Sequence, residues 1–98
     1  MSEEIQELFA VRTAAVQETD REAFRSTQLF EIDLSSIDEY LSLQNLAIEV
    51  LHIHRETDFE SVALVRETYT WREKPQRSTL LLYYLTRTVP GWRIFRIR

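Results

Sequence analysis

The sequence predicts an α+β fold, with N-terminal helices packed on a curved, four-stranded antiparallel sheet. Apolar residues recur at steps of three and four near the start of the chain, which is typical of helices, and at every second position after Asn45, which is typical of strands. The links between the later segments are short, whereas a parallel return needs a crossover of about a dozen residues or more. Helices followed by antiparallel strands indicate an α+β architecture.

The composition is that of one globular domain. Of the 98 residues, 44% are hydrophobic and 29% are charged, with one Gly and two Pro. Such a chain is too apolar for a disordered segment and too short for two domains, so we expect a single domain over residues 1–98. It contains no Cys, which excludes a disulfide framework, a Cys-ligated zinc or iron–sulfur centre and thiol catalysis. We expect no cofactor.

The formal net charge of −4 is unevenly distributed, with −10 in residues 1–60 and +6 in residues 61–98. The basic residues are spread along predicted strands, so acidic helices beside a basic sheet explain the asymmetry, and we expect no nucleic-acid partner. The acidic first turn is unlike a signal peptide, and no uncharged run approaches the roughly 20 apolar residues of a membrane span. We expect a cytoplasmic protein without a membrane partner.

The first helix is predicted from Ser2, which can cap it, to about Thr19. Its acidic first turn suits the positive end of the helix dipole. Residues at steps of three and four form one stripe along this helix, and we expect that stripe to be its buried face: Ile5, Leu8, Phe9, Arg12, Ala15 and Val16.

Two shorter helices are expected next. The sequence Thr19-Asp20-Arg21-Glu22 has the form of a capping box, which predicts a second helix from Asp20 to near Gln28. A brief extended segment over Leu29–Leu34 precedes a third helix from Ser36 to Leu43, where two capping boxes overlap.

Four strands complete the chain, and turn-forming residues separate them. In the first strand, alternation places Leu46, Ile48, Val50, His52 and His54 on one face. The predicted strands are Leu46–Arg55, Ser61–Arg72, Arg77–Val89 and Trp92–Ile97.

The expected register decides which side chains face the helices. A hairpin that pairs Arg72 with Arg77 places Tyr69 opposite Leu80, and a two-residue turn at Pro90-Gly91 places Tyr84 opposite Ile97. The face expected beneath the helices then contains Ala63, Val65, Glu67, Tyr69, Trp71, Leu80, Leu82, Tyr84, Phe95 and Ile97. The opposite face contains Val62, Leu64, Arg66, Leu81, Tyr83, Leu85, Arg87, Trp92, Ile94 and Arg96.

The order of elements and the end of the chain resemble the nuclear transport factor 2-like superfamily, which includes SnoaL-like cyclases, ketosteroid isomerases and scytalone dehydratase. The resemblance rests on the amphipathic first helix, a strand of the Val62–Trp71 type and the long strand Ser78–Thr88. The closing sequence Pro90-Gly91-Trp92-Arg93-Ile94-Phe95-Arg96-Ile97 is similar to the family's ending of turn Gly, Trp, basic residue and Ile.

This resemblance implies a cone-shaped, cystatin-like α+β barrel that dimerises through its sheet and holds a small apolar cavity between helices and sheet. The chain is compact for the family, because residues 20–35 leave little room for the second helix and opening strands that wall the cone. A shallow or partly closed pocket is therefore expected. Family isomerases pair a Tyr with carboxylic acids, whereas the first helix here has Phe9 and no Tyr.

Glu67 is the best candidate for a catalytic residue. A lone carboxylate among apolar side chains has its charged form disfavoured, which raises its pKa towards a value useful for proton transfer. The alternative is an ion pair with a neighbouring Arg. Tyr69 and Tyr84 are candidate hydrogen-bond donors to a ligand, or core residues whose hydroxyls reach water. The expected ligand pocket contains Phe9, Glu67, Tyr69, Tyr84 and Phe95.

The opposite sheet face is expected to form a dimer interface, because it is apolar with interspersed Arg. His52 and His54 lie two apart on one strand without further ligands, so we expect no metal site. An anion site formed by several Arg residues is an alternative to a solvated or interfacial role. The interface is predicted to contain Arg66, Tyr83, Leu85, Trp92 and Ile94.

These observations predict a small homodimeric module that binds a small hydrophobic ligand without established catalysis. One alternative is an isomerase, dehydratase or cyclase that uses Glu67 with Tyr69 or Tyr84. Another is a pure interaction domain whose cavity is filled by its own side chains. Because one fold hosts many functions, the sequence does not identify the ligand or substrate.

Overall fold

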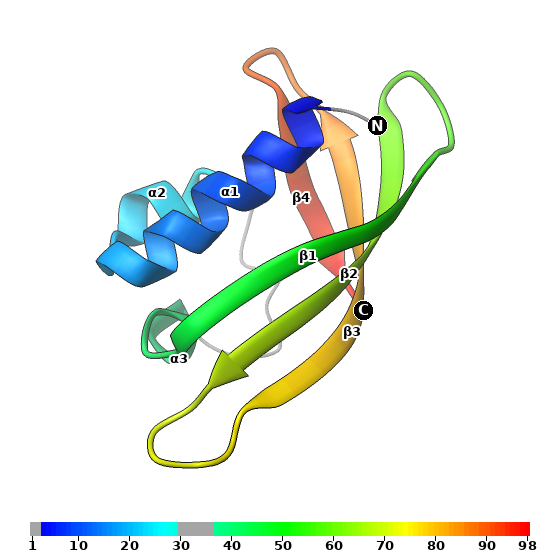
Figure 1. The fold of residues 1–98 in the computed structure, drawn as a ribbon. Helices are drawn as coiled ribbons and strands as arrows, with labels where there is room; N and C mark the ends of the chain where they lie inside the picture. Colours follow the sequence, from blue (N-terminus) through cyan, green and yellow to red (C-terminus); the bar gives the residue numbers. More distant parts are fainter. Residues whose placement is uncertain (1–2, 30–36) are drawn as a thin grey trace.

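The computed structural model describes residues 3–29 and 37–98 and confirms the predicted α+β fold. Among the described residues, three helices precede a four-stranded sheet in which neighbours along the chain pair antiparallel, in the order β1-β2-β3-β4. Figure 1 shows α1 lying across one face of the twisted sheet. The helices are α1 (Glu3–Glu18), α2 (Arg21–Arg25) and α3 (Ile37–Leu41), and the strands are β1 (Gln44–Arg55), β2 (Glu60–Thr70), β3 (Arg77–Arg87) and β4 (Trp92–Ile97).

The buried face of α1 contains all six predicted residues, from Ile5 to Val16. The helix ends at Glu18, and the next residue, Thr19, adopts the left-handed conformation with φ of 55°. There the amide of Thr19 donates to the carbonyl of Val16, and the amide of Asp20 donates to that of Ala15, a pairing that satisfies the last carbonyls of a helix. The predicted cap at Ser2 lies outside the described residues.

The predicted start of α2 is confirmed, because Asp20 is its N-cap and accepts a hydrogen bond from the amide of Ala23. The helix ends at Arg25, earlier than predicted. Thr27 and Gln28 instead run beside β4, where the amide of Ile94 donates to the carbonyl of Thr27 at 2.8 Å. Most of the extended segment predicted over Leu29–Leu34, and the predicted start of α3 at Ser36, lie outside the described residues.

The sheet register differs from the predicted one. Tyr69 pairs with Arg77 and not with Leu80, because β2 ends at Thr70 and a six-residue turn follows. In that turn Arg72 adopts a positive φ of 59°. The pairing is displaced by three residues, and an odd displacement moves every β3 side chain to the other face relative to β2.

A β-bulge displaces the last strand as well. It lies between Tyr84 and Leu85, and Ile97 pairs with Tyr83 instead of the predicted Tyr84. The predicted dimer face is therefore wrong for four of its five residues. Arg66 is exposed on the outer face, but the other four are buried beneath α1: Tyr83, Leu85, Trp92 and Ile94.

A second bulge, between Val50 and His52, interrupts the alternation of β1. Ile48 and Val50 pack towards the core, whereas His52 and His54 are exposed. The predicted common face for these residues is wrong, because the extra residue reverses the side-chain order along the strand.

The buried apolar residues in the described part of the chain form two clusters. One lies between α1 and the sheet, and the other joins α1 to α2, α3 and the start of β1. No helix within residues 3–29 and 37–98 is long and apolar enough to span a membrane. The first cluster contains Ile5, Leu8, Phe9, Ala63, Val65, Tyr83, Leu85, Trp92 and Ile94, and the second contains Ala15, Val16, Phe24, Ile37, Leu41 and Leu46.

Candidate functional site

Glu67 is buried on the helix-facing side of β2, with 3% of its surface exposed. Its Oε2 accepts a hydrogen bond from the phenolic hydroxyl of Tyr83 on β3. A buried carboxyl group needs such partners, because losing its hydration costs free energy. The two strands therefore bring together a carboxyl group and a phenol at the inner side of the sheet.

Tyr83 is held between the sheet and α1. Its ring meets that of Phe9 edge to face, with 5.0 Å between the ring centroids. Burial raises the pKa of the Tyr83 hydroxyl well above its ordinary value, and the neighbouring Glu67 raises it further. The hydroxyl consequently keeps its proton and remains a hydrogen-bond donor throughout the physiological pH range.

Arg12 brings a buried positive charge close to this pair. The guanidinium lies 4.1 Å from the centroid of the Phe24 ring and 5.8 Å from that of Tyr83. Its Nη1 donates to Oγ1 of Thr27 at 2.8 Å and to Oε1 of Gln28 at 2.9 Å. The charge of Arg12 opposes the effect of Glu67 by lowering the pKa of Tyr83, although burial dominates.

Residues 27 and 28 pair with β4, and this pairing positions the two side chains that accept hydrogen bonds from Arg12. The residues that follow α2 therefore help to build the site. Sequence reasoning found Arg12 only as a member of the buried stripe. The available signal was a charged residue within that stripe, because an Arg on a buried helix face needs partners of its own.

A cavity of about 280 Å³ lies between α3, the residues just after it and the hairpin formed by β2 and β3. Glu67 lines this cavity together with residues of α3, β2 and β3 and of the segments that follow α3 and β2. Aromatic or aliphatic side chains form most of the wall. The lining residues are Glu39, Tyr40, Leu43, Glu67, Tyr69, Trp71, Arg77, Thr79 and Leu81.

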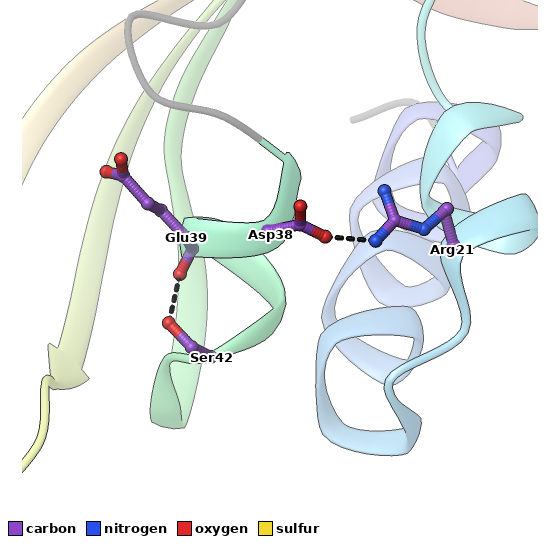
Figure 2. Close-up of polar contacts among 4 residues, drawn as sticks. All are labelled: Arg21, Asp38, Glu39 and Ser42. Atoms are coloured by element: carbon purple, nitrogen blue, oxygen red, sulfur yellow. Dashed lines mark hydrogen bonds and ion pairs between the residues drawn. The ribbon is translucent and has the colours of Figure 1, made fainter.

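An exposed ion pair links α3 to α2 on the side of α3 away from the cavity. Arg21 forms an ion pair with Asp38, and the Ser42 hydroxyl donates to the carbonyl of Glu39 at the end of the helix. Figure 2 shows that the Glu39 side chain points away from Arg21. Glu39 therefore contributes its carboxylate to the rim of the cavity while Asp38 serves the contact between helices.

Solved structures share this architecture over nearly the whole chain. A nuclear transport factor 2-like protein of unknown function from Shewanella oneidensis matches 96% of this chain and 93% of its own, with a TM-score of 0.78 and 14% identity. The chain has a nuclear transport factor 2-like fold. The identity is low, so the likeness establishes the fold and leaves the chemistry to the site.

Two further solved structures with this fold are similar to the chain and are described as different kinds of protein. A ketosteroid isomerase-like protein from Erwinia carotovora matches 96% of this chain and 90% of its own, with a TM-score of 0.69 and 14% identity. A predicted calcium/calmodulin-dependent protein kinase type II association domain from Thiobacillus denitrificans matches 93% and 89%, with a TM-score of 0.67 and 15% identity. Comparison with protein-family models and with curated proteins gives no match.

Within the nuclear transport factor 2-like fold, the predicted pocket residues separate into three places. Glu67 and Tyr69 line the cavity. Phe9 is buried in the core against Tyr83. The predicted positions of Tyr84 and Phe95 are wrong, because the register places Tyr84 on the outer face, where its ring lies 6.3 Å from that of Phe95.

Other predicted site residues lie away from the cavity. Arg66 on the outer face forms an ion pair with Glu49 of β1 at 3.0 Å. His52 and His54 are exposed, and the described part of the chain contains no group of three or more His, Asp or Glu residues able to hold a metal ion. Two wider depressions of about 630 and 810 Å³ flank the start of α1, and charged residues such as Glu3, Glu4 and Arg87 line both.

Proposed function

We propose that the protein binds a small, largely apolar ligand in the cavity between α3 and the hairpin of β2 and β3. The observation that carries this proposal is the wall of the cavity, in which aromatic and aliphatic side chains surround one buried carboxyl group, that of Glu67. Binding sites for small molecules have this character, because apolar walls supply affinity and a few polar groups fix orientation.

The size of the cavity limits the ligand. At about 280 Å³ it lies just below the range of roughly 300–1,000 Å³ that is typical of drug-sized ligands. A compound with one ring fits within this space.

The melting temperature in the presence of benzyl alcohol tests this proposal, because a ligand that binds only the folded state stabilises it by mass action. We expect benzyl alcohol at millimolar concentration to raise the melting temperature. Thr79→Trp, at an exposed lining position, should fill the cavity and abolish that rise. Ser78→Trp is the matched control on the opposite face and should keep it. A rise of equal size in both variants would contradict the proposal.

Proton-transfer catalysis is a second candidate, and the hydrogen bond from Tyr83 to Glu67 favours it. A carboxyl group at the cavity wall can take a proton from carbon, as an isomerase, dehydratase or cyclase requires, while a protonated phenol orients it. Deuterium exchange next to the carbonyl of cyclohexanone in D₂O, followed by NMR, tests this candidate. If the protein is such an enzyme, the wild-type protein accelerates the exchange and Glu67→Gln does not. No acceleration by the wild-type protein would exclude proton-transfer catalysis for this substrate.

We also propose that the chain acts as a homodimer, as one cytoplasmic domain, joined through the outer face of the sheet. Leu80 and Leu82 are 58% and 37% exposed there, and Tyr84 lies on the same face of β3. This set replaces the buried residues predicted from the sequence. A pure interaction domain is distinguished by a melting temperature that rises with protein concentration and does not respond to benzyl alcohol.

A further inference from the structure

The charged groups of the cavity are unevenly placed. The lining contains two carboxyl groups, those of Glu39 and Glu67, and one guanidinium, that of Arg77. Glu67 is buried, whereas Glu39 and Arg77 are exposed. A ligand that enters past the rim therefore meets an acceptor as its innermost polar partner, and the only cation among the lining residues stays at the outside.

Three aromatic rings face the same space from three places in the chain. Tyr40 comes from α3, Tyr69 from β2 and Trp71 from the turn after β2. The face of an aromatic ring carries negative charge density and attracts cations within about 6 Å of its centroid. Aromatic rings with nearby carboxylates form the kind of site that holds organic ammonium groups.

Two of these rings already hold cations of the chain itself. The guanidinium of Arg12 lies 5.6 Å from the centroid of Tyr40. At Trp71, the guanidinium of Arg72 lies at 5.0 Å and the ammonium group of Lys74 at 5.5 Å. Positive groups are therefore already accommodated beside two of these rings, and the wider surroundings of the cavity include these cations of the chain as well as its two carboxyl groups.

We infer that the ligand of this cavity is a small organic cation with one ring, which places its ammonium group towards Glu67 and its apolar part against Tyr40, Tyr69 and Trp71. This inference rests on the proposed function and names the chemical class of the ligand. The rival class is an anion held by Arg77 at the rim. That arrangement brings an anion into a cavity that two carboxyl groups line, those of Glu39 and Glu67.

The test compares three compounds of similar size and different charge: benzylammonium, benzyl alcohol and benzoate. Their dissociation constants are measured with the full chain by calorimetry at pH 7 and low salt. We expect the dissociation constant of benzylammonium to be at least tenfold lower than that of benzyl alcohol, with benzoate the weakest. Half-molar salt should reduce the difference, because it screens the attraction between charges.

Variants assign this preference to the cavity. Trp71→Leu should reduce the advantage of benzylammonium, and Trp71→Phe, which keeps a ring, should restore most of it. Glu67→Gln should reduce it further. If Glu67→Gln fails to fold, the two Trp71 variants still test the inference, because Trp71 is only half-buried. Phe59→Leu is the control, because Phe59 is an exposed aromatic residue in the link between β1 and β2.

The outcomes separate the inference from the proposed function. Equal affinity for benzylammonium and benzyl alcohol, or preferred binding of benzoate, overturns the inference and leaves ligand binding in place. An advantage of benzylammonium that persists in Trp71→Leu and Glu67→Gln also overturns it, since the cation then binds elsewhere. Failure of all three compounds to bind overturns both the inference and the proposed function.

Discussion

The hydroxyl of Tyr83 donates a hydrogen bond to Oε2 of Glu67, and both residues are buried between the sheet and the helices. This contact supplies a buried carboxyl group with a donor that keeps its proton, since burial raises the pKa of Tyr83. It also fixes the direction of the Glu67 side chain at the wall of the cavity. The structure of the site and its stability are therefore linked through one pair.

The raised pKa of Tyr83 predicts a loss of stability at alkaline pH. The folded state holds the Tyr83 proton above the ordinary pKa of 10.0, whereas the unfolded state releases it there. The contribution of Tyr83 to the free energy of unfolding is therefore complete below about pH 10. It falls as the pH rises further, by up to about 1.4 kcal/mol per pH unit. Urea unfolding between pH 8 and pH 11 should show a steeper decline for the wild-type protein than for Tyr83→Phe. Equal slopes would contradict this account.

Two buried hydroxyls predict opposite effects on stability. Oγ of Ser61 is buried without a hydrogen-bond partner among the described residues, so Ser61→Ala should leave the free energy of unfolding unchanged or raise it by up to about 1 kcal/mol. Oγ1 of Thr27 accepts from Arg12 and donates to the carbonyl of Phe24, so Thr27→Val should cost about 1–3 kcal/mol. Urea unfolding at pH 7 measures both, and a comparable loss in the two variants would refute the assignment.

The end of α1 offers a stabilising substitution. Thr19 is exposed and adopts a left-handed conformation that costs a residue with a side chain about 1–2 kcal/mol. Thr19→Gly should therefore raise the free energy of unfolding by about 1 kcal/mol, since glycine is the preferred residue at this position. Thr19→Ala is the control and should bring no such gain. Thermal unfolding followed by circular dichroism gives both values, and a loss in Thr19→Gly would count against the helix end described here.

The proposed dimer predicts that a charge on the outer sheet face separates the chains. Leu80→Glu places a carboxylate at the most exposed leucine of that face, opposite Arg66 of β2, where burial against a partner would remove its hydration. Sedimentation velocity should find the wild-type protein at twice the chain mass and Leu80→Glu at the chain mass of 11.7 kDa. Val89→Glu, in the exposed turn between β3 and β4, should remain dimeric. A wild-type monomer at high concentration would exclude the dimer.

The helices and the order of the strands follow from local patterns in the sequence. The stripe from Ile5 to Val16 repeats with the period of a helix, and Asp20 has the chemistry of an N-cap. Such signals involve residues close in the chain, so the sequence alone predicted the buried face of α1 and the start of α2 correctly.

The register did not follow from the sequence, because it depends on turn geometry and bulges. The six-residue turn around Arg72 displaced β3 by three residues, and the bulges in β1 and at Tyr84 reversed the faces that alternation predicts. Glu67 was correctly expected on the helix-facing side, but Tyr83 was expected on the other. Their contact could therefore be seen only in three dimensions.

Arg12 shows the same limit on the helical side. Its place on the buried stripe was predicted, but its acceptors on Thr27 and Gln28 depend on the pairing of that segment with β4. No local pattern marks a pairing between residues more than sixty positions apart.

The two tryptophans allow the most direct test of ligand binding in the cavity. Trp71 lines the cavity, whereas Trp92 is buried in the core beneath α1 and does not. A titration with benzyl alcohol, followed through the two indole N–H signals by NMR, should shift the Trp71 signal saturably and leave the Trp92 signal in place. An unmoved Trp71 signal, or equal shifts of both, would contradict a binding cavity between α3 and the β2–β3 hairpin.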